Sequence, residues 1–171
     1  IAPVFFLVFL GIVEYGMYML TQIAIEGAVS QGGRMASVGS GADLATRVRE
    51  DVMRRTSGLP NASNIVVSAN LIGAGATSAP DVCVVGGNPS TGSCPSGSPF
   101  IDNNGNGVFD APGGVSLGAP GDMVEIRASY PWRVMIPIFN QFVSSTDQNG
   151  NTVNGVAMIT SSTVIRNEPS L

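Results

Sequence analysis

The sequence predicts an α+β protein: a long N-terminal hydrophobic helix, a second amphipathic helix, and then a small antiparallel β-sheet head. Residues 1–25 are mostly apolar, with Glu14 as the single acidic interruption. Apolar residues recur at helical spacing between residues 41 and 57, and beyond Pro60 β-branched residues become frequent. The chain therefore divides into a transmembrane or assembly helix, residues 1–38, and an α+β head, residues 39–171.

The N-terminal segment is long enough to cross a membrane. Ile1 to Val13 carries no charge, and no basic residue precedes Arg34. A helix needs about 20 apolar residues to cross about 30 Å of hydrocarbon, whereas a signal peptide has a basic start and a shorter apolar core. We expect this segment to lie in a membrane or in the helical core of an assembly. A buried helix of a soluble domain is the alternative.

Small residues favour close packing along the same helix. Gly32 and Gly33 weaken a helix by about 1 kcal/mol each without ending it, and a helix unbroken to Val38 would be about 50 Å long. A row of small residues at i+4 spacing lets helix backbones approach closely; its members here are Ala24, Ala28, Gly32 and Ala36. Either this row packs against another helix, or alanine and glycine are simply common in the segment.

Glu14 is a candidate helix-packing residue, because a carboxylate within an apolar helix is costly and usually has a partner. It could set the register between packed helices or pair with the amine of a neighbouring chain, and Tyr18, one turn further on, could hydrogen-bond to it. The alternative is a carboxylate that reaches water or is protonated. We place Glu14 and the nearby Gly16 with the small-residue row as the helix-packing set.

A second helix is predicted at about residues 41–57. Ser40 or Gly41 can cap its start, and the Ser-Gly-Leu-Pro run at residues 57–60 ends it. Its apolar row packs down, while its charged residues form three i,i+4 pairs: Arg47–Asp51, Glu50–Arg54 and Asp51–Arg55. We interpret this charged face as solvated; contact with lipid headgroups or a partner is the alternative.

The remaining elements are strands. The β-branched or alternating segments are Asn64 to Ile72, Asp122 to Tyr130, and Val153 to Arg166, with a possible bend at Gly155 and a short fourth candidate at Val82 to Val85. Pro137 bars residues 133–143 from a central strand or a regular helix interior, so this segment is assigned no element. We expect the strands to form a small antiparallel sheet packed on the second helix.

Composition excludes several functions. The net charge is −4, and all eight cations are arginines, so no basic patch for nucleic acid is expected. The absence of histidine and lysine removes the usual general bases, and no nucleophile elbow or phosphate loop is present. We therefore expect neither an enzyme nor a binder of small-molecule substrates.

The two cysteines predict a disulfide. Cys83 and Cys94 bracket a Gly/Pro/Ser/Asn-rich loop of ten residues, and without histidine they cannot complete a usual four-ligand zinc site. A disulfide closing this loop would stabilise the fold by about 2 to 3 kcal/mol. It would also place the head outside the cytoplasm.

A calcium-like loop follows the cysteines. Residues 102–110 read D-N-N-G-N-G-V-F-D, which matches the spacing of oxygen ligands in calcium loops. The candidate ligands are Asp102, Asn104, Asn106, Asp110 and the carbonyl of Val108. The twelfth position is Gly113 and not the bidentate glutamate of an EF-hand, so binding at about 10⁻⁴ to 10⁻³ M is expected. An ordinary Asx-turn loop without an ion is the alternative.

Two segments resemble one known family. Pro3 to Gly16 reads P-V-F-F-L-V-F-L-G-I-V-E-Y-G and resembles the P-x₇-G-I-x-E-[FY]-G core of TadE-like proteins, the minor pilins or pseudopilins of tight-adherence (Tad) pili. The C-terminal run from Val164 to Pro169 is similar to the V-V-R-N-E-P ending of that family. The family's processing-site glutamate would lie upstream of Pro3, so these residues leave processing by a prepilin peptidase open.

The resemblance implies a structural, pilin-like subunit in a bacterial membrane with an extracytoplasmic head. Its N-terminal helix would pack against its own copies or other pilin subunits, passing from the membrane into an extracellular filament at the cell surface. The alternative is a single-span accessory subunit of a larger membrane complex, whose head binds a protein or glycan. The partner of the small-residue row distinguishes these two hypotheses.

Overall fold

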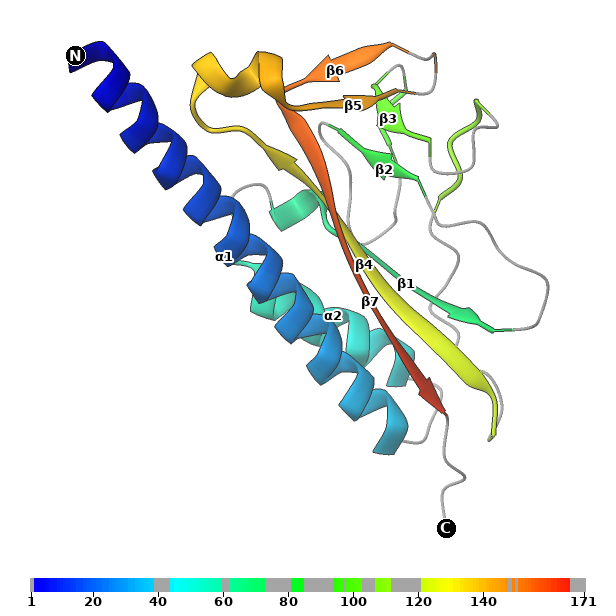
Figure 1. Ribbon diagram of the computed structural model, residues 1–171. Helices are drawn as coiled ribbons and strands as arrows, with labels where there is room; N and C mark the ends of the chain where they lie inside the picture. The colour runs from blue at the N-terminus through cyan, green and yellow to red at the C-terminus, as the bar shows by residue number, and fades with distance from the viewer. Residues whose placement is uncertain are drawn as a thin grey trace.

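The computed structural model describes residues 2–38, 44–59, 62–72, 81–84, 94–96, 98–102, 107–111, 121–147, 149 and 151–166. The helical elements are α1 (Ala2–Val38), α2 (Leu44–Thr56) and the short 3₁₀ helices η1 (Ala62–Asn64) and η2 (Pro137–Phe142). The strands are β1 (Val66–Leu71), β2 (Val82–Cys83), β3 (Phe100–Ile101), β4 (Met123–Arg133), β5 (Ser144–Thr146), β6 (Thr152–Asn154) and β7 (Val156–Arg166). The predicted α+β fold is confirmed, and Figure 1 shows α1 and α2 on one side of the strands.

The main sheet is antiparallel, in the order β1-β4-β7. The predicted alternation along β4 is present, because every second side chain from Val124 to Trp132 is at most 2% exposed. The strand continues beyond its predicted end at Tyr130, through Pro131. β1 reaches only as far as Ser129, so the missing N–H at Pro131 removes no hydrogen bond to β1.

The C-terminal half of α1 belongs to the core of the head. Ile25, Ala28, Val29 and Ala36 are each at most 1% exposed and join one hydrophobic cluster with residues of β1, β4 and β7. The prediction that the sheet packs on the second helix is therefore incomplete, because α1 also lies against it. The hydrophobic core crosses the predicted boundary at residue 38, which periodicity alone could not show.

The small-residue row approaches α2 of the same chain at Gly32. Ala28, Gly32 and Ala36 are buried, and Ala24 is half-buried. A Cβ at Gly32 would lie only 3.1 Å from Val52 Cγ2 of α2. The close helix approach expected from these residues thus occurs within the chain, and an assembly contact through α1 would have to use its exposed residues.

Other elements differ from prediction in detail. A positive φ of 74° at Gly155 separates β6 from β7, which is the bend expected there. The unassigned segment after Arg133 forms η2, with Pro137 in its first turn. β3 and β5 were not predicted, since two- and three-residue strands carry little periodicity. The predicted caps at residues 40 and 41, and residues 167–169 of the C-terminal motif, lie outside the described residues.

The charged face of α2 is organised around Asp51. This carboxylate is 3% exposed and accepts hydrogen bonds from Arg55 Nε, at 2.6 Å, and from Arg54. The predicted Asp51–Arg55 pair is therefore present, and the hydrogen bond from Arg55 lowers the pKa of Asp51 below its usual value.

Replacing Asp51→Asn should lower the free energy of unfolding by about 1 to 3 kcal/mol at neutral pH. Because the folded-state pKa of Asp51 is lowered, its contribution is complete above the unfolded-state pKa of about 3.9 and is lost as the pH falls through the folded-state value. Denaturation of both proteins from pH 7 down to pH 2 measures this. A difference that stays constant over that range would contradict the prediction; Glu50→Gln, at an exposed neighbour, is the control.

Candidate functional site

The N-terminal part of α1 exposes a continuous apolar surface. Residues 2–10 are all exposed, and α1 is long and apolar enough to cross a membrane. The large side chains that are 36 to 68% exposed are Val4, Phe5, Phe6, Leu7, Val8, Phe9, Leu10, Ile12, Val13, Tyr15, Leu20 and Ile23. Such a surface is much larger than the isolated apolar residues usual on soluble proteins.

The head contacts α1 from Gly11 onward, because a Cβ on Gly11 would lie 3.5 Å from Phe139 Cζ. Residues on one helical face, from Tyr18 through Thr21 to Ile25, become progressively more buried. Only the part from Ala2 to Leu10 precedes this contact, and its nine residues rise about 14 Å of the roughly 30 Å of a hydrocarbon core. Beyond Glu14, lipid or a neighbouring chain could therefore reach only the side of α1 that faces away from the head.

Glu14 connects α1 to the start of η2. Its carboxylate accepts hydrogen bonds from the backbone N–H of Met135, at 2.9 Å, and of Ile136, at 3.2 Å. The next residue, Pro137, has no N–H to offer, so the carboxylate satisfies the last two amides before the 3₁₀ helix. The structure thus gives Glu14 a contact within the chain, across more than 120 residues, which differs from each of the roles considered from the sequence. Tyr18 instead packs its ring edge-to-face with Trp132, at 6.2 Å between centroids.

Replacing Glu14→Ala should lower the free energy of unfolding by about 1 to 3 kcal/mol, because two backbone amides lose their hydrogen-bond acceptor. Glu14→Gln keeps one side-chain oxygen and should retain part of that stability. Hydrogen exchange at the amides of Met135 and Ile136 provides the direct measurement, and both should exchange faster in Glu14→Ala. Unchanged exchange at these two amides would mean that the contact does not form in solution.

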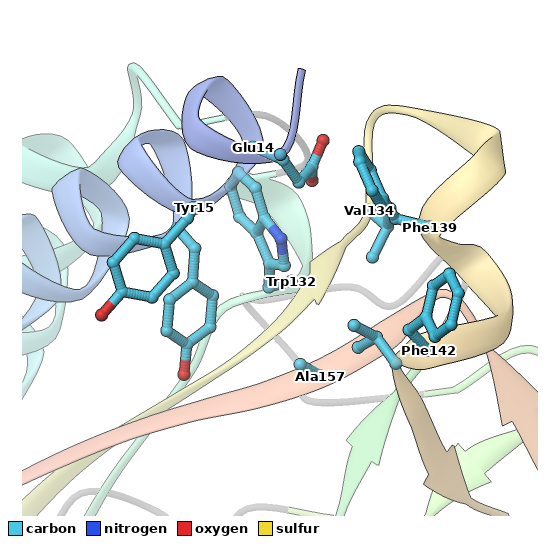
Figure 2. A pocket seen from close by; sticks show the side chains of 10 residues that line it. Glu14, Tyr15, Trp132, Val134, Phe139, Phe142 and Ala157 are labelled. Atoms are coloured by element: carbon cyan, nitrogen blue, oxygen red, sulfur yellow. The ribbon is translucent and has the colours of Figure 1, made fainter. Parts of the chain in front are cut away.

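An apolar groove lies between α1 and η2. Its volume is about 520 Å³, and Figure 2 shows Glu14 and Tyr15 of α1 on one side and Phe139 and Phe142 on the other. Its lining residues are Gly11, Glu14, Tyr15, Tyr18, Trp132, Val134, Phe139, Phe142, Val143 and Ala157. Glu14 is the single ionisable carboxylate in this lining, and it is already bonded to two amides. The groove is thus suited to hydrophobic contact and not to acid–base chemistry.

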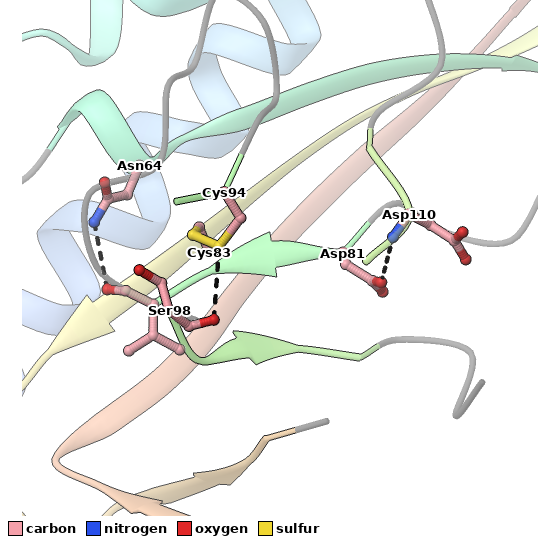
Figure 3. The surroundings of a disulfide bond; sticks show 7 residues. Asn64, Asp81, Cys83, Cys94, Ser98 and Asp110 are labelled. Carbon is pink, nitrogen blue, oxygen red and sulfur yellow. Dashed lines mark hydrogen bonds between the residues drawn. A yellow bond between two sulfur atoms is a disulfide. The ribbon is translucent and has the colours of Figure 1, made fainter. Parts of the chain in front are cut away.

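The predicted disulfide is present. Cys83 and Cys94 are bonded, with their Cα atoms 5.5 Å apart, and the bond ties β2 to the segment that leads into β3 (Figure 3). The neighbouring Asn64 donates from Nδ2 to the carbonyl of Val84 at 3.5 Å. These contacts hold the small β2–β3 sheet beside the start of β1.

The predicted calcium loop is described only in part. Asn104 and Asn106 lie outside the described residues, whereas Asp102, Val108 and Asp110 lie within them. Asp102 Oδ2 accepts the N–H of Gly107 at 2.7 Å, so the loop closes across five residues, a longer span than the two residues of an Asx turn. Over the described residues, no three acidic, cysteine or histidine side chains converge as a metal site. Calcium therefore stays a prediction.

A buried carboxylate beside this loop was missed by sequence reasoning. Asp81 is 0% exposed, and its Oδ2 accepts the N–H of Asp110 at 2.8 Å (Figure 3). The N–H of Asp81 in turn donates to the carbonyl of Asp110 at 3.1 Å. No spacing rule links residues 29 positions apart, so only the fold brings them together.

Comparison with known proteins identifies the N-terminal segment. Residues 1–34 match the family model described as TadE-like protein. No curated protein and no solved structure matches the chain. The matched segment contains the G-I-V-E-Y-G run and from Ala2 onward lies within α1. The match suggests a Tad-pilus-related subunit, and the apolar helix suggests membrane anchoring. The predicted resemblance to the TadE-like pilin family is confirmed over residues 1–34.

Proposed function

We propose that this chain is a structural, non-enzymatic pilin-like subunit that is anchored by α1 and assembles with other pilin subunits, its head lying on the outer side of the membrane. The observation that carries the proposal is the division of α1. Its first part is exposed and apolar, and its second part is built into the core of a folded head. A helix needed only for the head would not expose phenylalanines at positions 5, 6 and 9.

The disulfide supports an extracytoplasmic head. Disulfides persist in oxidising compartments and are rare in the cytosol. Both cysteines of the chain are used in this one bond. With the apolar helix α1 in the membrane, a head on the outer side lies in a compartment where its disulfide can persist.

The exposed side of α1 provides a surface for neighbouring subunits. Ile12, Leu20 and Ile23 are 63 to 66% exposed and lie on the side away from the head. Beyond Ile23 the exposed positions become polar, at Glu26, Ser30 and Arg34. In an assembly, helices of other subunits would cover the apolar part and leave the polar part in water.

Imaging of the native assembly, with variants on this surface, tests the proposal. Ile23→Glu should prevent incorporation into the assembly while leaving the head folded, because it puts a charge on the apolar side of α1. Gln31→Glu, at an exposed polar position of the same helix, is the matched control and should be incorporated normally. A single copy held inside a hetero-complex would contradict a filament-forming role and favour the accessory-subunit alternative.

Calcium at residues 102–110 is part of the proposal. The two described carboxylates, Asp102 and Asp110, fit a weak site, and the turn at Gly107 already closes onto Asp102. Chelation of calcium should lower the melting temperature and increase protease cleavage within this loop. Adding magnesium at the same concentration as calcium should not restore the melting temperature, because magnesium demands a tighter octahedral shell of ligands. If chelation leaves the melting temperature and the cleavage pattern unchanged, the loop is an ordinary turn.

A further inference from the structure

The segment around η2 exposes large apolar side chains. Met135, Ile138 and Phe142 are 55%, 52% and 74% exposed. All three lie within eight residues of chain, and η2 contains no buried residue. In Figure 1 this segment lies at the end of the head nearest the N-terminal half of α1, whereas Met123 and Arg166 lie at the other end of the sheet.

Two contacts fix the position of η2 along the axis of α1. Glu14 bonds to the amides of Met135 and Ile136. A Cβ on Gly11 would lie 3.5 Å from Phe139 Cζ, so η2 also packs directly on the helix at that position. η2 therefore lies beside residues 11–14, where the part of α1 that precedes the head contact ends.

An exposed tyrosine lies at the same position along α1. Tyr15 is 61% exposed and lines the groove beside η2, whereas Trp132 in the same lining is buried. Tyrosine and tryptophan are enriched where a bilayer meets water, because their rings are amphipathic. Apolar residues of α1 lie on the N-terminal side of this level, and the folded head lies on the other side.

We propose that Met135 and η2 insert into the interfacial layer of the bilayer that holds α1, with Ile138 and Phe142 as the anchoring side chains. Lipid is favoured as the occupant because the exposed surface of η2 is continuous, through the Gly11–Phe139 contact, with the apolar surface of α1. Exposed Arg133, just before this segment, can keep its charge among the headgroups. This inference rests on the proposed membrane anchoring, and it adds a second contact that would restrain the tilt of the head.

Tryptophan fluorescence of the full chain in phosphatidylcholine vesicles tests the inference. Ile138→Trp is compared with Val164→Trp, which replaces an equally exposed apolar residue at the far end of the sheet, at 57%. The emission of unmodified Trp132 is subtracted from both. We expect a blue-shifted emission for Ile138→Trp that is quenched by dibrominated phosphatidylcholine, and a water-like, unquenched emission for Val164→Trp.

Two outcomes would overturn the inference. Ile138→Trp could emit like the Val164→Trp control, or its emission could be blue-shifted without quenching by brominated lipid, as coverage by a second copy would produce. Phe5→Trp reports separately on α1. Quenching of Phe5→Trp without quenching of Ile138→Trp rejects only the η2 contact, whereas absence of both rejects the membrane anchoring on which it depends.

Discussion

Replacing Trp132→Ala is expected to lower the free energy of unfolding by about 3 to 5 kcal/mol, the cost of deleting a large buried aromatic side chain. Trp132 is 2% exposed, lies on the central strand β4 and packs edge-to-face against Tyr18 of α1. Its removal creates a cavity where helix and sheet meet, so it loosens both parts at once. The total free energy of unfolding of a small domain is only about 5 to 15 kcal/mol, so this loss is a large fraction of its stability.

Denaturation in detergent micelles, followed by far-UV circular dichroism, measures this loss without relying on the chain's single tryptophan. Tyr15→Ala is the matched control, because Tyr15 lines the same groove but is 61% exposed. It should change stability by no more than about 0.5 kcal/mol. Equal effects of the two variants would mean that α1 and the sheet are held together elsewhere.

The second large effect is expected for Gly33→Leu. A Cβ at Gly33 would lie 2.8 Å from Thr163 Cγ2 and 3.2 Å from Ile165 Cγ2, both on β7. β-Branched side chains are stiff and cannot turn away easily. Leucine at this position should therefore push α1 away from the sheet. We expect the free energy of unfolding to fall by about 1 to 3 kcal/mol, although leucine has a better helix propensity than glycine.

Gly27→Leu separates the packing effect from the propensity effect. Gly27 lies on the same helix, but a Cβ there meets nothing within 4 Å. Leucine at Gly27 should stabilise the helix by up to about 1 kcal/mol, so the two substitutions are expected to have opposite signs. The same sign in both would show that the contact between Gly33 and β7 does not decide how closely α1 approaches the sheet.

Elements with strong local patterns were predicted well. The apolar run to Ile25, continued by small residues, predicted an unbroken helix to Val38, and α1 extends without a break from Ala2 to Val38. Alternation predicted β4, and the cysteine spacing predicted the disulfide. These features depend on residues close together in the chain, where the periods of 3.6 and 2 residues can be read directly. The ends of elements were less accurate, as at Pro131, because they depend on neighbouring strands.

The partners of the predicted features could not be read in the same way. Glu14 was recognised as anomalous, but the amides that it binds follow β4, more than 120 residues away. The small-residue row was recognised as a packing surface, but its member Gly32 packs on α2, the next helix of the same chain. Asp81 has no local signal at all.

The sequence by itself determined the apolar helix, the α+β head, the disulfide and the resemblance to TadE-like proteins, because each is encoded by local spacing or a short motif. Only the tertiary structure decided how α1 is divided between an exposed apolar surface and the core of the head. That division depends on which face of α1 the sheet covers. Hydropathy reports only how many apolar residues follow one another along the chain, whereas burial depends on contacts between residues that are far apart in the sequence. Only the folded chain brings Gly33 against β7 and Glu14 against the amides before η2.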